Sequence, residues 1–207
     1  MMIPSQSGNH MTQNSIWLKG LLAMVVASAS TQALAAQSEY TLDPSQTVVR
    51  FEVKRFGISH QSGEFSTVAG TVAINSTSGS GSIDIAVDTR SVRAGNETEE
   101  KFLRGPNVLN VEEFSEIAYK AEHVVFANGK PERIDGHLTL LGVTRAVSLT
   151  VTRYTCPGAS KNIQEACKLD ATAVFKRSEF GMTRYMAIIS DEVKLAIHGV
   201  AGEAVRE

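Results

Sequence analysis

A strict alternation of apolar and polar residues is the feature that most limits what this chain can fold into. At Val49, Phe51 and Val53 the apolar side chains are separated by charged ones, which predicts a strand with one face in a core and one in water. A turn region that contains His60 and Gly63 is expected after this strand. The alternation returns in later segments, at residues 65–74, 83–88, 117–126, 133–141, 147–152, 169–175 and 193–197. Roughly eight strands joined mostly by short turns, with no βαβ rhythm, predict an all-β domain that is a closed antiparallel barrel or a sandwich.

Residues 95–119 interrupt the alternation between the third and fourth predicted strands. Asn96 is suited to cap a short helix, with Glu99 three positions later as the second half of a capping box. Only Phe102 and Leu103 are strongly apolar in the predicted helix, so it cannot form a core layer by itself. We expect a short helical excursion whose apolar face lies as a plug over the β structure.

The first 35 residues have the pattern of a secretory signal peptide. Lys19 is the only charged residue before Glu39, and residues 20–29 form an apolar run that is too short to span a bilayer. An A-x-A cleavage signal follows at residues 33–35. We expect cleavage of residues 1–35, in preference to an uncleaved anchor. One domain, residues 36–207, would then be periplasmic or secreted.

The charge of the chain is close to balanced, with a formal net charge of −2. No basic stripe is visible in the sequence, so we expect no nucleic-acid partner.

Cys156 and Cys167 are the only cysteines. A structural disulfide between them is the expected state in an oxidising compartment. Two free thiols are the first alternative, and a catalytic pair is the second. Their spacing fits no common zinc or redox motif.

The predicted inward faces mix glycine and alanine with phenylalanine, which leaves two interpretations of the interior. The mixture suits a barrel filled by its own side chains, and it equally suits an eight-stranded barrel that holds one apolar ligand. Apolar residues between the strands, at 56–58, 102–103, 180–182 and 186, exceed what the loops of a filled barrel need. Methionine is also suited to adaptable binding surfaces. These segments favour a pocket.

Two cations, Arg55 and Arg177, each follow directly on an inward-facing apolar run. In that position a guanidinium group is able to meet an anionic or polar head group of a ligand. The alternative, favoured for each residue singly, is that the side chain extends to solvent at the rim.

The sequence gives little support for an enzyme. The histidines of the predicted domain are scattered, at His60, His123, His137 and His198, with no metal-binding spacing. Ser59-His60 and Ser190-Asp191 form a triad only on paper, because no G-x-S-x-G elbow accompanies them. We expect no catalytic residue, no metal site and no cofactor.

Several stretches of the chain together resemble the YceI-like family. They are YTLD at 40–43, VRFEVKRFGISHQSG at 49–63, residues 95–114, GHLTLLGVTRAV at 136–147, KRSEFGM at 176–182 and ISDEV at 189–193. The resemblance implies an exported, lipocalin-like eight-stranded barrel that holds a polyisoprenoid or a similar long amphiphile without catalysis. The cysteine-bearing loop departs from the common form of the family.

The resemblance also implies a set of ligand-binding residues, which are apolar or aromatic. The set is Phe51, Val53, Phe56, Phe65, Phe102, Leu103, Phe114, Tyr119, Phe175, Phe180 and Met182, to which strand phase adds Arg55 and Arg177. Three other functions stay open: the same barrel with another lipophile (a quinone, a fatty amide or a hydrophobic antibiotic), a ligand-free stress-protective protein, and a hydrolase. Transient membrane contact and a homodimer, through a strand edge or the plug, also stay open.

Overall fold

The computed structural model describes residues 38–75, 80–156 and 166–203. All of them belong to one compact unit, Ala35–Glu207. The predicted signal peptide, residues 1–35, lies outside the described residues, and the prediction of its cleavage stays a prediction. No helix within the described ranges is both long and apolar enough to cross a membrane.

The described residues form eleven strands, one α-helix and two short 3₁₀ helices. The strands are β1 (Ser38–Leu42), β2 (Val48–Arg55), β3 (Ser59–Phe65), β4 (Val68–Asn75), β5 (Ser80–Asp88), β6 (Val92–Arg93), β7 (Glu116–Ala127), β8 (Lys130–Leu140), β9 (Val143–Thr155), β10 (Cys167–Lys176) and β11 (Ile189–Glu203). The helices are η1 (Thr89–Ser91), α1 (Glu97–Arg104) and η2 (Arg177–Phe180).

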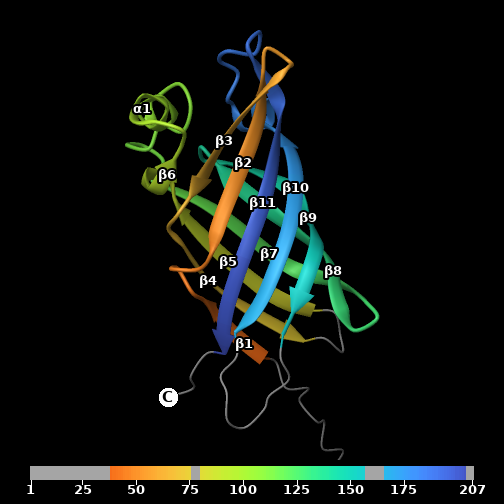
Figure 1. Cartoon of the computed structure of the whole chain (residues 1–207). Coiled ribbons are helices and arrows are strands. Elements are labelled where there is room, and N and C mark those ends of the chain that lie inside the picture. The colour runs from red at the N-terminus through yellow and green to blue at the C-terminus, as the bar shows by residue number, and fades with distance from the viewer. Residues whose placement is uncertain (1–37, 76–79, 157–165, 204–207) are drawn as a thin grey trace, which may run out of the picture. The chain divides into compact units, whose positions relative to one another are not determined.

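The sheet closes into an antiparallel barrel with eight positions around its wall. Its order runs β1-β4-β5-β7-β8-β9-β10-β11, and β11 pairs again with β1 (Figure 1). The long strand β11 also pairs with β2 along Ile189–His198 before it reaches β1 at Ala201–Glu203. The predicted barrel is therefore confirmed, and the alternative of a sandwich is wrong.

Three of the eight wall positions are built from two strands each, which is why the structure has eleven strands. They are β1 with β2, β3 with β4, and β5 with β6. The region that contains His60 and Gly63, which we expected to be a turn, forms most of β3, so that expectation is wrong. The sequence of β3, SHQSGEF, has no apolar alternation, and its extended form comes from pairing with β2 over the register Val49↔Phe65 to Arg55↔Ser59.

The helical excursion is confirmed as α1, between the third and fourth wall positions. The Asn96 side chain accepts a hydrogen bond from the Glu99 amide at 3.0 Å, as a helix cap does. No residue of α1 is buried, in agreement with its low apolar content. The Glu99 carboxylate accepts a bond from Gln61 of β3 at 2.8 Å, so this side chain also joins the helix to the barrel.

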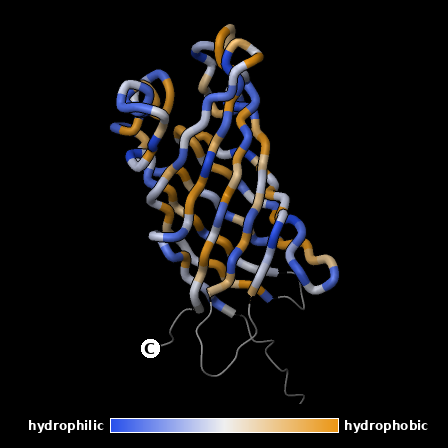
Figure 2. Tube along the Cα trace, in the orientation of Figure 1, coloured by the Kyte–Doolittle hydropathy of each residue, from blue (hydrophilic) through white to orange (hydrophobic). Residues whose placement is uncertain are grey.

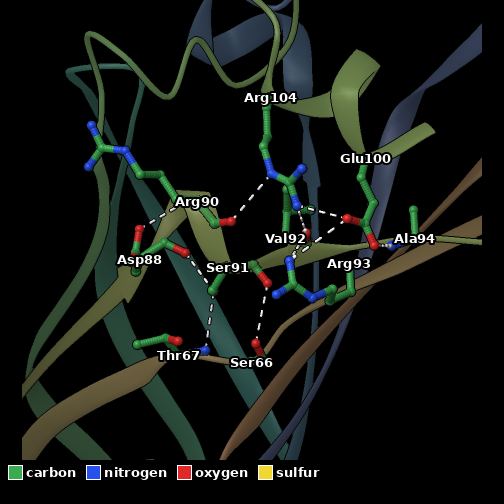
Figure 3. A network of polar contacts seen from close by, with 10 residues as sticks. All are labelled: Ser66, Thr67, Asp88, Arg90, Ser91, Val92, Arg93, Ala94, Glu100 and Arg104. Atoms are coloured by element: carbon green, nitrogen blue, oxygen red, sulfur yellow. Dashed lines mark hydrogen bonds and ion pairs between the residues drawn. The ribbon is translucent and has the colours of Figure 1, made fainter. Parts of the chain in front are cut away.

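A polar network fixes the inner side of α1 to the barrel (Figure 3). Arg104 donates to the carbonyl of Val92 at 2.9 Å and to the carboxylate of Glu100, one turn earlier, at 2.8 Å. Below it, the Ser91 hydroxyl accepts from the Thr67 amide at 3.1 Å and donates to the Asp88 carbonyl at 2.7 Å. The helix is thereby tied to the same corner where β3 turns into β4 and β5 into β6.

Candidate ligand-binding site

The barrel encloses a cavity of about 660 Å³. This volume lies within the range of about 300–1,000 Å³ that is usual for small-molecule sites. Inward side chains from every wall position contribute to it, among them Val72, Ile85, Leu138, Leu149 and Ile197. The interior is therefore hollow, which separates the two interpretations that the sequence left open.

The cavity opens between α1, the β2–β3 turn and the segment that follows η2. Its exposed lining residues among those described all lie at this end: Arg55, Ser62, Thr98, Phe102, Asn107, Tyr185 and Ile188. At the mouth, the ring of Phe102 on α1 lies 5.3 Å from the ring of Tyr185. The polar lining residues Gln61 and Glu99 are also at the mouth, whereas aliphatic side chains dominate the interior.

Most of the residues predicted to bind a ligand line this cavity. They are Phe51, Val53, Arg55, Phe65, Phe102, Leu103, Tyr119, Phe175, Arg177 and Met182. Strand phase explains the members on β2, β7 and β10, since alternate residues of a strand point to the same face. Whether these side chains contact a ligand stays a prediction.

Phe56, Phe114 and Phe180 are not brought to the cavity wall. Phe56 lies in the β2–β3 turn and is 61% exposed. Phe114 is half-buried and packs near Gly142, where a Cβ would lie 3.2 Å from its ring. Phe180 is buried behind the wall, with its ring edge-on to Phe175 at 5.2 Å.

Arg177 is held inside the protein and does not extend to solvent. The residue is only 7% exposed, and its guanidinium group donates hydrogen bonds to four backbone carbonyls. The acceptors are those of Ser190 at 2.9 Å, Met182 and Arg184 at 2.8 Å, and Ile189 at 3.0 Å. Burial lowers the pKa of this guanidinium from its ordinary value. Arg177 thus fastens the segment after η2 to the end of the barrel.

Arg55 behaves differently, because it is exposed at the mouth. Its guanidinium lies over the ring of Phe56, 5.5 Å from the ring centroid, a cation–π arrangement. It lines the cavity and is free to face a polar group there.

Tyr119 supplies a polar group deep in the wall. Its hydroxyl is within hydrogen-bond distance of two carbonyls, Val147 at 3.0 Å and Ile134 at 3.2 Å. Burial, with a smaller contribution from the charge of Asp135, raises the pKa of this phenol. The side chain is therefore neutral and already has acceptors for its proton.

Three aromatic residues of the lining, Tyr40, Tyr154 and Tyr185, were not among the predicted ligand-binding residues. Tyr154 is out of phase with Val151 because β9 and β10 shift register between Asp170 and Ala171, and a bulge reverses the face that later residues occupy. Tyr185 lies in a connecting segment that has no periodicity, so only the folded structure places it.

A disulfide joins Cys156 and Cys167, as predicted. Cys167 begins β10 and lines the end of the cavity away from α1. The residues between the two cysteines, 157–165, lie outside the described ranges.

The side chains that form a triad on paper have other partners in the structure. His60 lies 2.8 Å from the Glu52 carboxylate, and the Ser59 hydroxyl donates to the carbonyl of Arg55. Asp191 accepts from the backbone amide and the hydroxyl of Ser178. Within the described residues no group of three or more His, Cys, Asp or Glu side chains is arranged to hold a metal.

Comparison with known proteins finds a matching family and relatives that span nearly the whole chain. The profile of the YceI-like domain matches residues 40–201. A UPF0312 protein of Pectobacterium atrosepticum, ECA1782, is 27% identical over 191 residues, which cover 92% of this chain and 97% of the relative. A UPF0312 protein of Yersinia pestis is 25% identical and covers 87% of this chain and 93% of its own length.

Solved structures share the fold. BcnA of Burkholderia cenocepacia superposes with a TM-score of 0.63 at 21% identity, covering 77% of this chain and 98% of BcnA. A protein described as a polyisoprenoid binding domain from Saccharophagus degradans, implicated in plant cell wall breakdown, has a TM-score of 0.60 at 16% identity. It covers 80% of this chain and 98% of its own. At these identities the similarity concerns the fold.

Proposed function

This chain belongs to the YceI-like domain family, and we propose that it is an exported binding protein that holds a long-chain lipophile, a polyisoprenoid or a similar amphiphile, inside its barrel. The protein carries, stores or sequesters this molecule and does not transform it. The observation that carries the proposal is the cavity of about 660 Å³, which is largely aliphatic inside and has its charged lining residues, Arg55, Glu99 and Arg177, towards the mouth.

The distribution of lining residues fits a ligand with a long apolar part and one polar end. Interior side chains such as Leu138, Leu149 and Ile197 offer only hydrocarbon contacts. Burying each such side chain against an apolar chain contributes about 1.5–3 kcal/mol before ordering costs, so a few contacts suffice for micromolar affinity. Arg55 and Gln61 at the mouth are placed to meet the polar end.

Similarity of fold to the polyisoprenoid binding domain from Saccharophagus degradans supports the choice of an isoprenoid. The A-x-A signal at residues 33–35, after the apolar run at 20–29, supports export to the periplasm or beyond.

The direct test is mass spectrometry of an organic extract of the protein, purified from a periplasmic fraction without detergent. The proposal predicts a stoichiometric polyprenyl species. Two variants of β11 sharpen the test. Ile197→Trp fills part of the cavity and should empty the extract, whereas Ala196→Trp, on the exposed face of the same strand, should retain the lipid.

Other outcomes distinguish the alternatives. A stoichiometric quinone, fatty amide or antibiotic would keep the binding function and change the ligand. An empty extract, with no uptake of added polyprenols and no displacement of a lipophilic dye, would overturn the proposal in favour of a protein without a ligand.

A further inference from the structure

Exposed hydrophobic side chains gather at the mouth of the barrel. We call residues 54–60 and 181–189 together the apex. Among the large hydrophobic side chains that the structure describes as exposed, all but Val174 lie on the apex or beside it, on α1. They are Phe56, Ile58, Phe102, Tyr185, Met186 and Ile188, and Ile58 is 87% exposed. In Figure 2 the loops at the top of the view, which belong to the apex, contain hydrophobic stretches in orange. Such a concentration of exposed hydrophobic side chains marks a site of contact.

The charged residues of the apex are all positive. They are Lys54, Arg55 and Arg184, and neither segment contains an aspartate or a glutamate. None of the three makes an ion pair with a carboxylate among the described residues, although Arg50, Lys120 and Arg133 on the barrel wall do. The two apex segments therefore carry net positive charge beside exposed apolar groups, and the carboxylates of Glu52 and Glu192 lie outside them, near Lys54.

The two segments of the apex are fastened to each other and to the barrel. The Phe56 amide donates to the Ile188 carbonyl at 2.7 Å, and Arg177 holds the carbonyls of Arg184 and Ile189 from below. Phe56 and Tyr185 both have positive φ, 53° and 62°, a backbone region that bulky side chains rarely adopt. Backbone strain of this kind clusters at functional sites. Here it presents two aromatic side chains outside the core.

We propose that the apex docks onto the surface of a bilayer that contains anionic phospholipid. Isoleucine, methionine and aromatic rings insert into the boundary between head groups and acyl chains, and cations beside them attract anionic head groups. Arg55, Tyr185 and Ile188 belong both to the apex and to the cavity lining, so docking places the mouth against the lipid. This surface does not depend on which lipophile the cavity holds.

The two loops protrude from the end of the barrel, beyond the strands that carry them (Figure 1). Protruding loops that carry exposed apolar side chains and cations suit the surface of a bilayer with anionic head groups. The disulfide lies at the other end of the cavity, so docking through the apex leaves the disulfide end away from the bilayer.

The test is flotation with vesicles of phosphatidylethanolamine and phosphatidylglycerol, compared with pure phosphatidylcholine. The protein is used as the expressing cell processes it. Every variant shares the N-terminus of the wild type, so the contribution of that segment cancels. Wild-type protein should float with the anionic vesicles, and added salt should reduce the bound fraction.

Ile58→Asp should lower the partition coefficient at least about tenfold, since it removes one buried isoleucine from the contact. Arg55→Gln and Arg184→Gln should each lower it about fivefold, and only with anionic vesicles. Val174→Asp is the matched control, because Val174 is an exposed apolar residue of β10 away from the apex. It should leave the partition coefficient unchanged, and circular dichroism checks the fold of each variant.

Failure of wild-type protein to bind anionic vesicles would overturn the proposal, as would an equal loss in Val174→Asp. A wild-type dimer that Ile58→Asp makes monomeric, without vesicle binding, would also overturn it and assign the apex to self-association. The vesicles contain no isoprenoid and flotation does not report on the cavity, so these results are independent of the lipid extract.

Discussion

The ring of Tyr119 lies against Gly136 of the neighbouring strand β8, at a place where no side chain fits. A Cβ at Gly136 would lie 2.6 Å from the Cζ and hydroxyl of Tyr119 and 2.7 Å from the carbonyl oxygen of Lys120. Because Gly136 has no side chain, the phenol of Tyr119 lies over β8 and reaches the carbonyls of Val147 and Ile134. A backbone position thus determines where a polar side chain of the lining sits.

Gly136→Ala should destabilise the protein by about 1–3 kcal/mol, because the added methyl group clashes with a buried ring and with backbone. Urea unfolding of variant and wild type measures the change. Gly202→Ala on β11 is the control, since nothing lies within 4 Å of its Cβ position. Equal unfolding free energies for Gly136→Ala and the wild type would contradict the packing described here.

Tyr119→Phe should cost about 1 kcal/mol, because one buried carbonyl loses its donor. The raised pKa of Tyr119 also gives a pH dependence. Its contribution to stability is fully present below the ordinary tyrosine pKa of about 10 and is lost as the pH rises towards the native value. Unfolding measured above pH 10 should therefore show a steeper loss in wild-type protein than in Tyr119→Phe. Parallel curves would count against a buried, un-ionised phenol.

Asp191 should make the mouth sensitive to acid. Its carboxylate accepts from the backbone amide of Ser178 and from the hydroxyl of the same residue, and these bonds, the amide first, lower its pKa. The stability that it contributes is present above the ordinary aspartate pKa and is lost as the pH falls through the native one. Hydrogen exchange in η2 and residues 181–189 should accelerate at low pH.

The control for this acid effect is Asp191→Asn, which should exchange faster at neutral pH and respond less to acid. A variant that keeps the wild-type pH profile would show that another carboxylate controls this segment.

Phe102→Asp should weaken ligand binding about tenfold and leave the fold intact, since Phe102 lines the mouth without being buried. Displacement of a lipophilic dye by added polyprenol measures the affinity. Val174→Asp introduces the same charge at an exposed apolar position outside the cavity and should bind as the wild type does. If Phe102→Asp also binds normally, the plug formed by α1 does not contribute to binding, although the proposal of a binding barrel remains.

Removing the disulfide by Cys156→Ser and Cys167→Ser should cost about 3 kcal/mol, from the chain entropy of the loop between the cysteines. Chemical unfolding with and without reductant measures the difference. The wild type should lose stability on reduction, whereas the double variant should not respond. A wild type that is indifferent to reductant would contradict a stabilising role for the bond.

Apolar residues in one phase along most of the predicted strands indicated a barrel or a sandwich, and the resemblance to the YceI-like family selected the barrel. The phase that contains Phe51 and Val53 on β2, and Phe175 on β10, points into the cavity as predicted. The helix cap at Asn96 was also predictable, since it depends only on local spacing.

Other parts of the site depend on tertiary structure and were not predictable. Tyr154 faces the cavity because of a bulge that the alternation does not reveal. The confinement of Arg177 results from four carbonyls of the irregular segment and strand start that follow it, and no sequence pattern distinguishes it from Arg55. Strand β3 exists because β2 offers it a pairing edge, not because its own residues alternate.

Strand β11 closes the barrel by pairing with β10 on one side and with β2 and then β1 on the other. During synthesis on the ribosome, every other wall strand emerges before it. Until β11 arrives, the earlier strands can form only an open sheet with unpaired edges, which favours aggregation. Closure also joins residues that are far apart in sequence, such as Leu42 and Ala201, so we expect slow folding. The cavity is therefore complete only after β11 has been made, so any molecule that the closed barrel holds is loaded after translation.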